Sequence, residues 1–74
     1  MSPRLPVVSG QQLVKALERS GWEVARQRGS QVRLHHPDRR IFLTVPLHRE
    51  LKRGTLSGIL ADAGLNADEL RDRL

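Results

Sequence analysis

One stretch, from Arg26 to Arg53, decides the fold of this 74-residue chain, and it reads RQRGSQVRLHHPDRRIFLTVPLHRELKR. Two turn signals divide it, Gly29-Ser30 and Pro37-Asp38. Between them Val32 and Leu34 share one face of an alternating run. A period of two between short turns is typical of antiparallel strands with one face in water. We therefore predict a small antiparallel sheet in the middle of the chain.

The flanking runs extend this sheet on both sides. Trp22 and Val24 open a first strand that ends in Arg26 and Arg28, and Ile41, Leu43 and Val45 mark the buried face of a third strand. On the second strand, Gln31, Arg33 and His35 point away from the apolar face because side chains alternate along a strand. Pro46 ends the pairing, since it has no N–H to donate.

Helical patterns lie before and after the strands. Ser9 and Gln12 have the spacing of a capping box, which predicts a helix from about residue 10 to residue 19 that stops at Gly21. A second helix begins near Arg53 and stops at Gly64, and its apolar stripe consists of Leu56, Ile59, Leu60 and Ala63. Thr55 is a candidate cap of this helix, and Asn66 with Glu69 caps a short last helix, where Leu70 and Leu74 indicate weak docking or a partner contact.

These elements predict an α+β fold with the order α-β-β-β-α and a short extra C-terminal helix. Two helices on one face of a three-stranded antiparallel sheet leave the other face in water. The same order is that of double-stranded-RNA-binding domains. We expect one domain over residues 1–74, with residues 1–8 as an extended leader because Pro3 and Pro6 resist regular structure.

Positive charge is concentrated on the predicted sheet. Residues 24–53 carry eight basic and two acidic side chains, a net charge of +6, whereas the chain as a whole has +5. This concentration favours a nucleic-acid surface over a merely solvated face. The candidate RNA contacts are Arg26, Arg28, Arg33, His35, Lys52 and Arg53. Only Trp22, which we expect in the core or at its rim, and Phe42 are aromatic, so we expect recognition by charge and shape rather than by base stacking.

Several classes of protein do not fit the composition. The chain has no cysteine, which excludes disulfides and thiolate metal sites, and no apolar run near the about 20 residues of a membrane span, so we predict a cytoplasmic protein. His35 and His36 are adjacent on a strand and point to opposite faces, so we expect no metal site. Ser30 is interpreted as a turn residue rather than a nucleophile. No catalytic triad or carboxylate pair is evident.

The order of several short motifs resembles that of one known family. These motifs are Ser9-Gly10, Gly21-Trp22, Arg28-Gly29-Ser30, His36-Pro37-Asp38, Thr44-Val45-Pro46, the run Leu51 to Leu56, Ile59-Leu60 and Ala63-Gly64-Leu65. Together they resemble the HicA family of mRNA-cleaving toxins from bacterial toxin–antitoxin pairs. The resemblance implies a metal-independent endoribonuclease without a cofactor. It also implies a HicB-type antitoxin as partner and a complex with it.

The sequence departs from this family at Gln31. The resemblance places the catalytic histidine there, directly after Gly29-Ser30, and implies that its imidazole moves protons during attack on the phosphodiester. A glutamine amide offers hydrogen bonds but no usable proton exchange. Three accounts compete: a natural variant that binds without cleaving, an engineered change that makes a toxic chain tolerable, or His35 as a substitute base. The alternatives to an impaired nuclease are a non-catalytic module that binds RNA or the antitoxin, and an interaction domain for an acidic protein.

Overall fold

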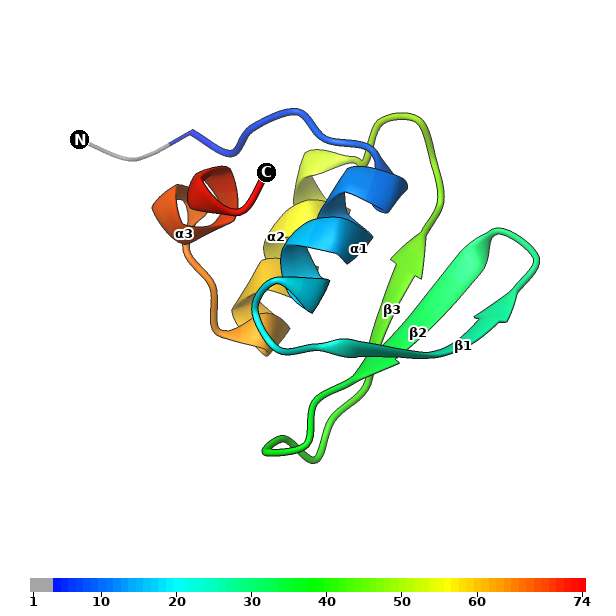
Figure 1. Ribbon diagram of the computed structural model, residues 1–74. Coiled ribbons are helices and arrows are strands. Elements are labelled where there is room, and N and C mark those ends of the chain that lie inside the picture. Colours follow the sequence, from blue (N-terminus) through cyan, green and yellow to red (C-terminus); the bar gives the residue numbers. More distant parts are fainter. Residues whose placement is uncertain (1–3) are drawn as a thin grey trace.

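The computed structural model describes residues 4–74, and Figure 1 shows the succession of its elements. Their bounds are α1 Gly10–Glu18, β1 Glu23–Arg28, β2 Gln31–His35, β3 Leu43–Pro46, α2 Arg53–Ala63 and α3 Ala67–Asp72. The α+β prediction, with the order α-β-β-β-α and a short extra C-terminal helix, is confirmed. Of the predicted leader, Pro3 lies outside the described residues.

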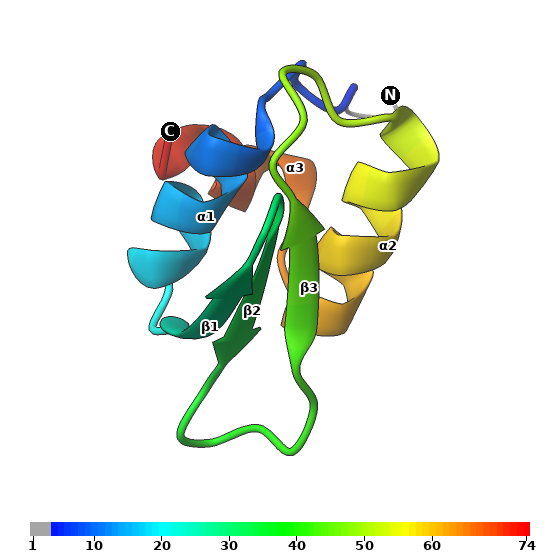
Figure 2. The ribbon, with the colours of Figure 1, turned by 90° about the vertical axis from the view of Figure 1, so that its right-hand side faces the viewer.

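The three strands form one antiparallel sheet in the order β1-β2-β3, so β2 pairs on both sides. Along β2, Val32 and Leu34 are buried, whereas Gln31 and Arg33 are exposed. Figure 1 shows the three helices on the same side of the sheet, and Figure 2 looks at the sheet from its opposite side. One face of the sheet therefore packs against helices, and the other face is open among the described residues.

The helix ends follow the local sequence closely. The Ser9 hydroxyl accepts a hydrogen bond from the Gln12 backbone N–H at 3.1 Å, and the Gln12 side chain accepts one from the Ser9 N–H at 2.8 Å. This reciprocal capping box satisfies two donors that a helix start otherwise leaves without partners. Asn66 and Glu69 form the same arrangement at α3. Gly64 ends α2 with φ 73°, in the left-handed region that favours glycine.

The core lies between the helices and the sheet. Its largest fully buried side chains include Leu13 and Leu17 of α1, Leu34 and Leu43 of the sheet, and Leu56 of α2. Full burial of one such side chain contributes about 1.5–3 kcal/mol relative to exposure. Trp22 and the leader residue Val8 are buried as well, and the Leu51 N–H donates to the Val8 carbonyl oxygen at 2.9 Å. The C-terminal part of the leader thus belongs to the core.

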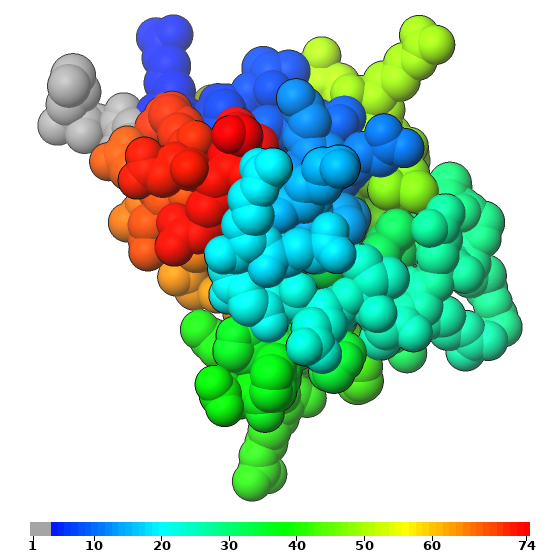
Figure 3. All heavy atoms as spheres, in the orientation of Figure 1, coloured from blue at the N-terminus to red at the C-terminus, as the bar shows by residue number. Residues whose placement is uncertain are grey.

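The last helix is anchored more firmly than the sequence predicts. Leu70 is fully buried in the core, whereas Leu74 is 47% exposed. The Arg19 guanidinium donates a hydrogen bond to the Arg73 carbonyl oxygen, and the C-terminal residues lie directly against the end of α1 in the space-filling view (Figure 3). The prediction of weak docking is therefore wrong for Leu70. No helix within residues 4–74 is both long and apolar enough to cross a membrane.

Two further sequence predictions are wrong. Ile41 is 45% exposed rather than buried, because β3 begins only at Leu43, where its pairing with Leu34 starts. Thr55 lies inside α2 and does not cap it, because the helix already begins at Arg53. The N-cap of α2 is Lys52, whose side chain makes no capping hydrogen bond.

α1 begins in close contact with the end of β3. The Gly10 N–H donates to the His48 carbonyl oxygen at 2.9 Å, and a Cβ at Gly10 would clash with the Pro46 carbonyl oxygen and lie 2.8 Å from the Cα of Leu47. Only glycine permits this approach. Pro46 lies opposite Gln31 in the sheet, so the contact also fixes the helix start relative to the first residue of β2.

This packing predicts opposite effects for two glycine substitutions. Gly10→Ala should lower the free energy of unfolding by about 1–3 kcal/mol, because the backbone of β3 must move to admit a methyl group. Gly58→Ala lies in α2 with nothing within 4 Å of the new Cβ, so it should raise that free energy by about 0.8–1.0 kcal/mol through helix propensity alone. Urea unfolding of both variants measures the effects. Equal stability of the two would contradict the close contact at Gly10.

Candidate nucleic-acid interface

A bulge at Ala25 determines which way the arginines of β1 point. Val24 lies opposite Leu34, but the next pair in register is Arg26 with Arg33, which leaves Ala25 as an extra residue. In a regular strand, Val24 and Arg26 would project from the same face. The extra residue shifts the alternation of side chains along β1. The Val24 side chain therefore points to the same face of the sheet as buried Leu34, and the Arg26 side chain points to the open face, as Arg33 does.

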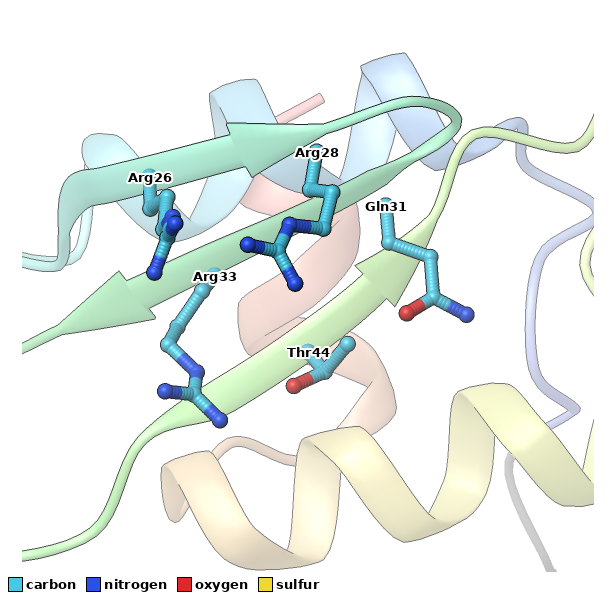
Figure 4. A pocket seen from close by; sticks show the side chains of 5 residues that line it. All are labelled: Arg26, Arg28, Gln31, Arg33 and Thr44. Atoms are coloured by element: carbon cyan, nitrogen blue, oxygen red, sulfur yellow. The ribbon is translucent and has the colours of Figure 1, made fainter.

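The arginines of β1 and β2 converge on a hollow in the open face. Arg28 lies opposite Gln31, and Arg33 lies opposite Thr44 of β3. Figure 4 shows these side chains projecting from the same face of the sheet. We call this site the arginine hollow, and its lining consists of Arg26, Arg28, Gln31, Arg33 and Thr44. Residues from all three strands therefore build it, and its geometry depends on the register of the whole sheet.

The arginine hollow has a strong positive field. Among the described residues, the ion pairs join His35 to Glu23 and Arg71 to Asp68, so none of the three arginines of the hollow has a carboxylate partner within salt-bridge distance. Guanidinium groups hold phosphate and carboxylate oxygens through paired, charge-assisted hydrogen bonds. Three of them on one open surface attract an anion and repel one another without it.

The size and chemistry of the hollow limit what it can hold. Its volume is about 230 Å³, below the about 300–1,000 Å³ that is usual for small-molecule and cofactor pockets. It is open to solvent and is lined by guanidinium, amide and hydroxyl groups rather than by apolar side chains. These features suit a phosphate of an extended polymer better than an enclosed ligand.

Gln31 is the first residue of β2 and contributes an uncharged amide group to the hollow. Its side chain is exposed and faces the same side as Arg28, its partner in register. The preceding turn contains Gly29 with φ 58°, and the Leu47 N–H donates to the Ser30 carbonyl oxygen at 2.6 Å. Ser30 is thus held as a turn residue. The amide of Gln31 can donate to and accept from a phosphate, but it does not exchange protons near neutral pH.

The structure separates the remaining predicted site residues from the hollow. His35 lies four residues beyond Gln31, about 13 Å along a strand, and its Nε2 is 3.3 Å from Glu23 Oε1. Lys52 is the N-cap of α2, and Arg53 lines a different groove beside the leader residue Leu5. Of the predicted residues, Arg26, Arg28, Gln31 and Arg33 therefore come together, whereas His35, Lys52 and Arg53 do not line the hollow.

Sequence reasoning missed Thr44. This residue stands between buried Leu43 and Val45, so the same alternation that marks the core also places its hydroxyl on the open face. A search along β3 for polar residues between apolar ones would have found it. Sequence reasoning also missed the bulge at Ala25, although apolar Val24 and basic Arg26 do not fit the same face of a regular strand.

The histidines point in different directions. The His36 ring packs edge-on against Trp22 with centroids 5.3 Å apart, and its Nδ1 accepts a hydrogen bond from the Asp38 N–H at 3.0 Å. His35 instead lies near Phe42 on the open face, with centroids 6.4 Å apart. Within residues 4–74, no group of three or more potential metal-ligating side chains lies together.

Comparison with models of protein families gives a match over most of the chain. A family model described as the HicA toxin of bacterial toxin–antitoxin pairs matches residues 10–65, which is more than half of the chain. The matched region begins at the start of α1 and ends just after α2, so it includes every residue of the arginine hollow. No curated protein matches the chain.

Proposed function

The chain belongs to the HicA toxin family of bacterial toxin–antitoxin pairs, and from this we propose that it binds messenger RNA through the arginine hollow. We further propose that the reaction of this site is metal-independent endoribonucleolytic cleavage, which Gln31 impairs. The observation that carries the proposal is the position of Gln31. It follows the turn Gly29-Ser30 and lies among three arginines that have no carboxylate partner.

Binding is the part of the function that this chain retains. Arg26, Arg28 and Arg33 supply positive charge and hydrogen-bond donors to phosphate oxygens, and the Thr44 hydroxyl adds a donor. Such contacts hold a strand in place without reading its sequence. The open and shallow shape of the hollow permits a phosphodiester in the middle of a long strand to reach it.

Cleavage needs a group that accepts and returns a proton near neutral pH. An imidazole at position 31 would face the hollow, where neighbouring positive charge lowers its pKa and keeps part of it neutral. The arginines would stabilise the negative charge that develops on the phosphate during attack. Gln31 leaves this electrostatic part in place and removes the proton transfer.

The same residue favours a second candidate function. A chain that keeps the cationic surface and lacks the base is suited to be a non-catalytic module that binds RNA or the antitoxin. His35 is a poor substitute for the base, since it lies about 13 Å along β2 from position 31 and pairs with Glu23. Proton transfer at that distance fails unless the substrate takes another position.

Family membership implies an antitoxin as partner. In our proposal this partner is of the HicB type, forms an oligomeric complex with the chain and covers the basic open face. A protein of this size buries only about 60–65% of its unfolded surface, so a partner adds substantially to its stability. The cytoplasm is the proposed location, because messenger RNA is the proposed substrate.

The first prediction of this proposal is that Gln31→His restores cleavage. A positioned general acid or base contributes about 10²–10⁴-fold in rate, so we expect at least a tenfold gain on a long mRNA in the presence of EDTA. RNA affinity should change little. Gln31→Asn is the control, because it alters the side chain without adding a titrating group.

Equal cleavage by the parent chain and Gln31→His would show that position 31 is not the vacated catalytic position. His35→Ala then identifies the substitute: a loss of cleavage in that variant would assign the proton transfer to His35. If Gln31→His cleaves RNA and the added substitution His35→Ala does not reduce the rate of that variant, the proton transfer is assigned to position 31.

The second prediction concerns the salt dependence of RNA binding. Each phosphate neutralised on a single strand contributes about 0.7 log units of affinity per log unit of salt. The double variant Arg26→Ala/Arg28→Ala should therefore flatten the slope by about 1.4, with little change in sequence preference. Lys15→Ala/Arg71→Ala removes the same charge from α1 and α3 and should leave the slope unchanged.

The separate variant Lys52→Ala/Arg53→Ala tests the two predicted contacts that do not line the hollow. A flatter slope here would extend the RNA footprint to the start of α2. An unchanged slope for Arg26→Ala/Arg28→Ala would mean that the arginine hollow does not hold phosphates.

The third prediction concerns the antitoxin. A ligand that binds only the native state raises its stability by RT ln(1 + [L]/Kd), about 2.7 kcal/mol when the free ligand is at a hundred times its Kd. The product of the adjacent gene should therefore raise the Tm by several degrees and co-purify with the chain, whereas an unrelated acidic protein should do neither. An unchanged Tm without co-purification would contradict the pairing.

A further inference from the structure

Phe42 lies exposed at the end of the open face. It immediately precedes β3 and stands on the same side as Thr44, at the end of the loop that extends beyond the rest of the molecule in Figures 1 and 2. Phe42 is 56% exposed, whereas Leu43 is 2% exposed. More than half of this aromatic side chain is therefore in contact with water.

Two neighbours on β2 hold this ring in position. The Arg33 Cζ lies 5.1 Å from the ring centroid, within the range of a cation–π interaction. The His35 ring lies 6.4 Å away at an angle of 49°. We call Arg33, His35 and Phe42 the aromatic corner. Because these contacts already orient the ring, a flat ligand that stacks on it loses little binding free energy to the ordering of side chains.

The aromatic corner differs from the arginine hollow in charge. Glu23 lies beside it, with its Oε1 3.3 Å from His35 Nε2, and this carboxylate disfavours a phosphate at the same end of the face. The hollow, in contrast, has three guanidinium groups and no carboxylate. The open face is therefore divided into a cationic end at Gln31 and an aromatic, less cationic end at His35, with Arg33 between them.

We propose that the aromatic corner binds one unstacked nucleobase of the RNA strand whose phosphate occupies the arginine hollow. This proposal rests on RNA binding at the hollow and adds the class of substrate, which is an unpaired strand. It also replaces the expectation, based on the scarcity of aromatic residues, that recognition does not use base stacking. Gln31 and His35 lie about 13 Å apart along β2, a length of no more than about four stacked nucleotides. A base within a duplex is stacked on both sides and cannot turn onto the ring, so the corner selects single-stranded RNA.

The test compares Phe42→Leu with the parent chain on three ligands: a single-stranded oligoribonucleotide, the same strand annealed to its complement, and an abasic strand of equal length. Stacking of a base on an aromatic side chain contributes about 1–3 kcal/mol, and an exposed ring belongs at the low end. Phe42→Leu should thus bind the unpaired strand about five- to tenfold more weakly. Its affinity for the duplex and the abasic strand should stay the same, and its salt slope should not change.

Two further variants distinguish stacking from other effects. Phe42→Trp should retain the affinity of the parent, and the fluorescence of its new exposed indole should be quenched when the unpaired strand binds. Ile41→Ala removes the neighbouring exposed apolar side chain and should bind all three ligands as the parent does. The Tm of each variant should match that of the parent, because both side chains lie outside the core.

Unchanged affinity of Phe42→Leu for the unpaired strand would overturn this inference alone, provided that the parent binds RNA with a steep salt slope. An equal loss on the abasic strand would also overturn it. Loss of antitoxin binding by Phe42→Leu, with RNA binding intact, would assign the corner to the protein partner instead. A parent chain that binds no RNA at all would remove the proposed function as well.

Discussion

The pairing of β2 with strands on both sides is the constraint on which the rest of the structure depends. Val32 and Leu34 face the helices, where both are buried in the core, because the other face would leave their apolar side chains in water. Side chains alternate, so burial of these two forces Gln31 and Arg33 to the open face. The strand register that buries Val32 and Leu34 in the core is therefore the same register that places Gln31 and Arg33 on the open face.

The bulge at Ala25 reconciles two demands on β1. The strand places Val24, which is 44% exposed, on the side of the helices and places Arg26 and Arg28 on the open face. A regular strand cannot do both, since these residues are separated by even numbers of positions. One extra residue changes the alternation at the cost of a local interruption of the hydrogen-bonded ladder, and it increases the twist that gathers the arginines over β2 and β3.

Most of the features that were predicted correctly from the sequence are local, and several of those that were missed depend on distant contacts. The capping box at Ser9, the stop at Gly64 and the alternation in β2 each rest on residues within a few positions of one another, and each was predicted correctly. The exposure of Ile41 depends on where β3 starts to pair with β2, which is a contact between residues far apart in the sequence. The separation of Lys52 and Arg53 from the hollow follows from the path of the loop after Pro46, which no short-range pattern encodes.

In our proposal the open face holds an RNA strand at two points, with a phosphate in the arginine hollow and a base on Phe42. Phosphate contacts in the arginine hollow hold any strand equally well, so they cannot choose which phosphodiester lies beside position 31. In our proposal a base stacked on Phe42 a few nucleotides away adds a second point of attachment. Every base can stack in this way, so the contact favours an unpaired strand over a duplex without selecting one base. Arg33 touches both parts, the hollow and the ring of Phe42, and so links the position of the phosphate to that of the base. On this proposal, preference for an unpaired strand would come from the aromatic end, and stabilisation of the developing charge from the cationic end.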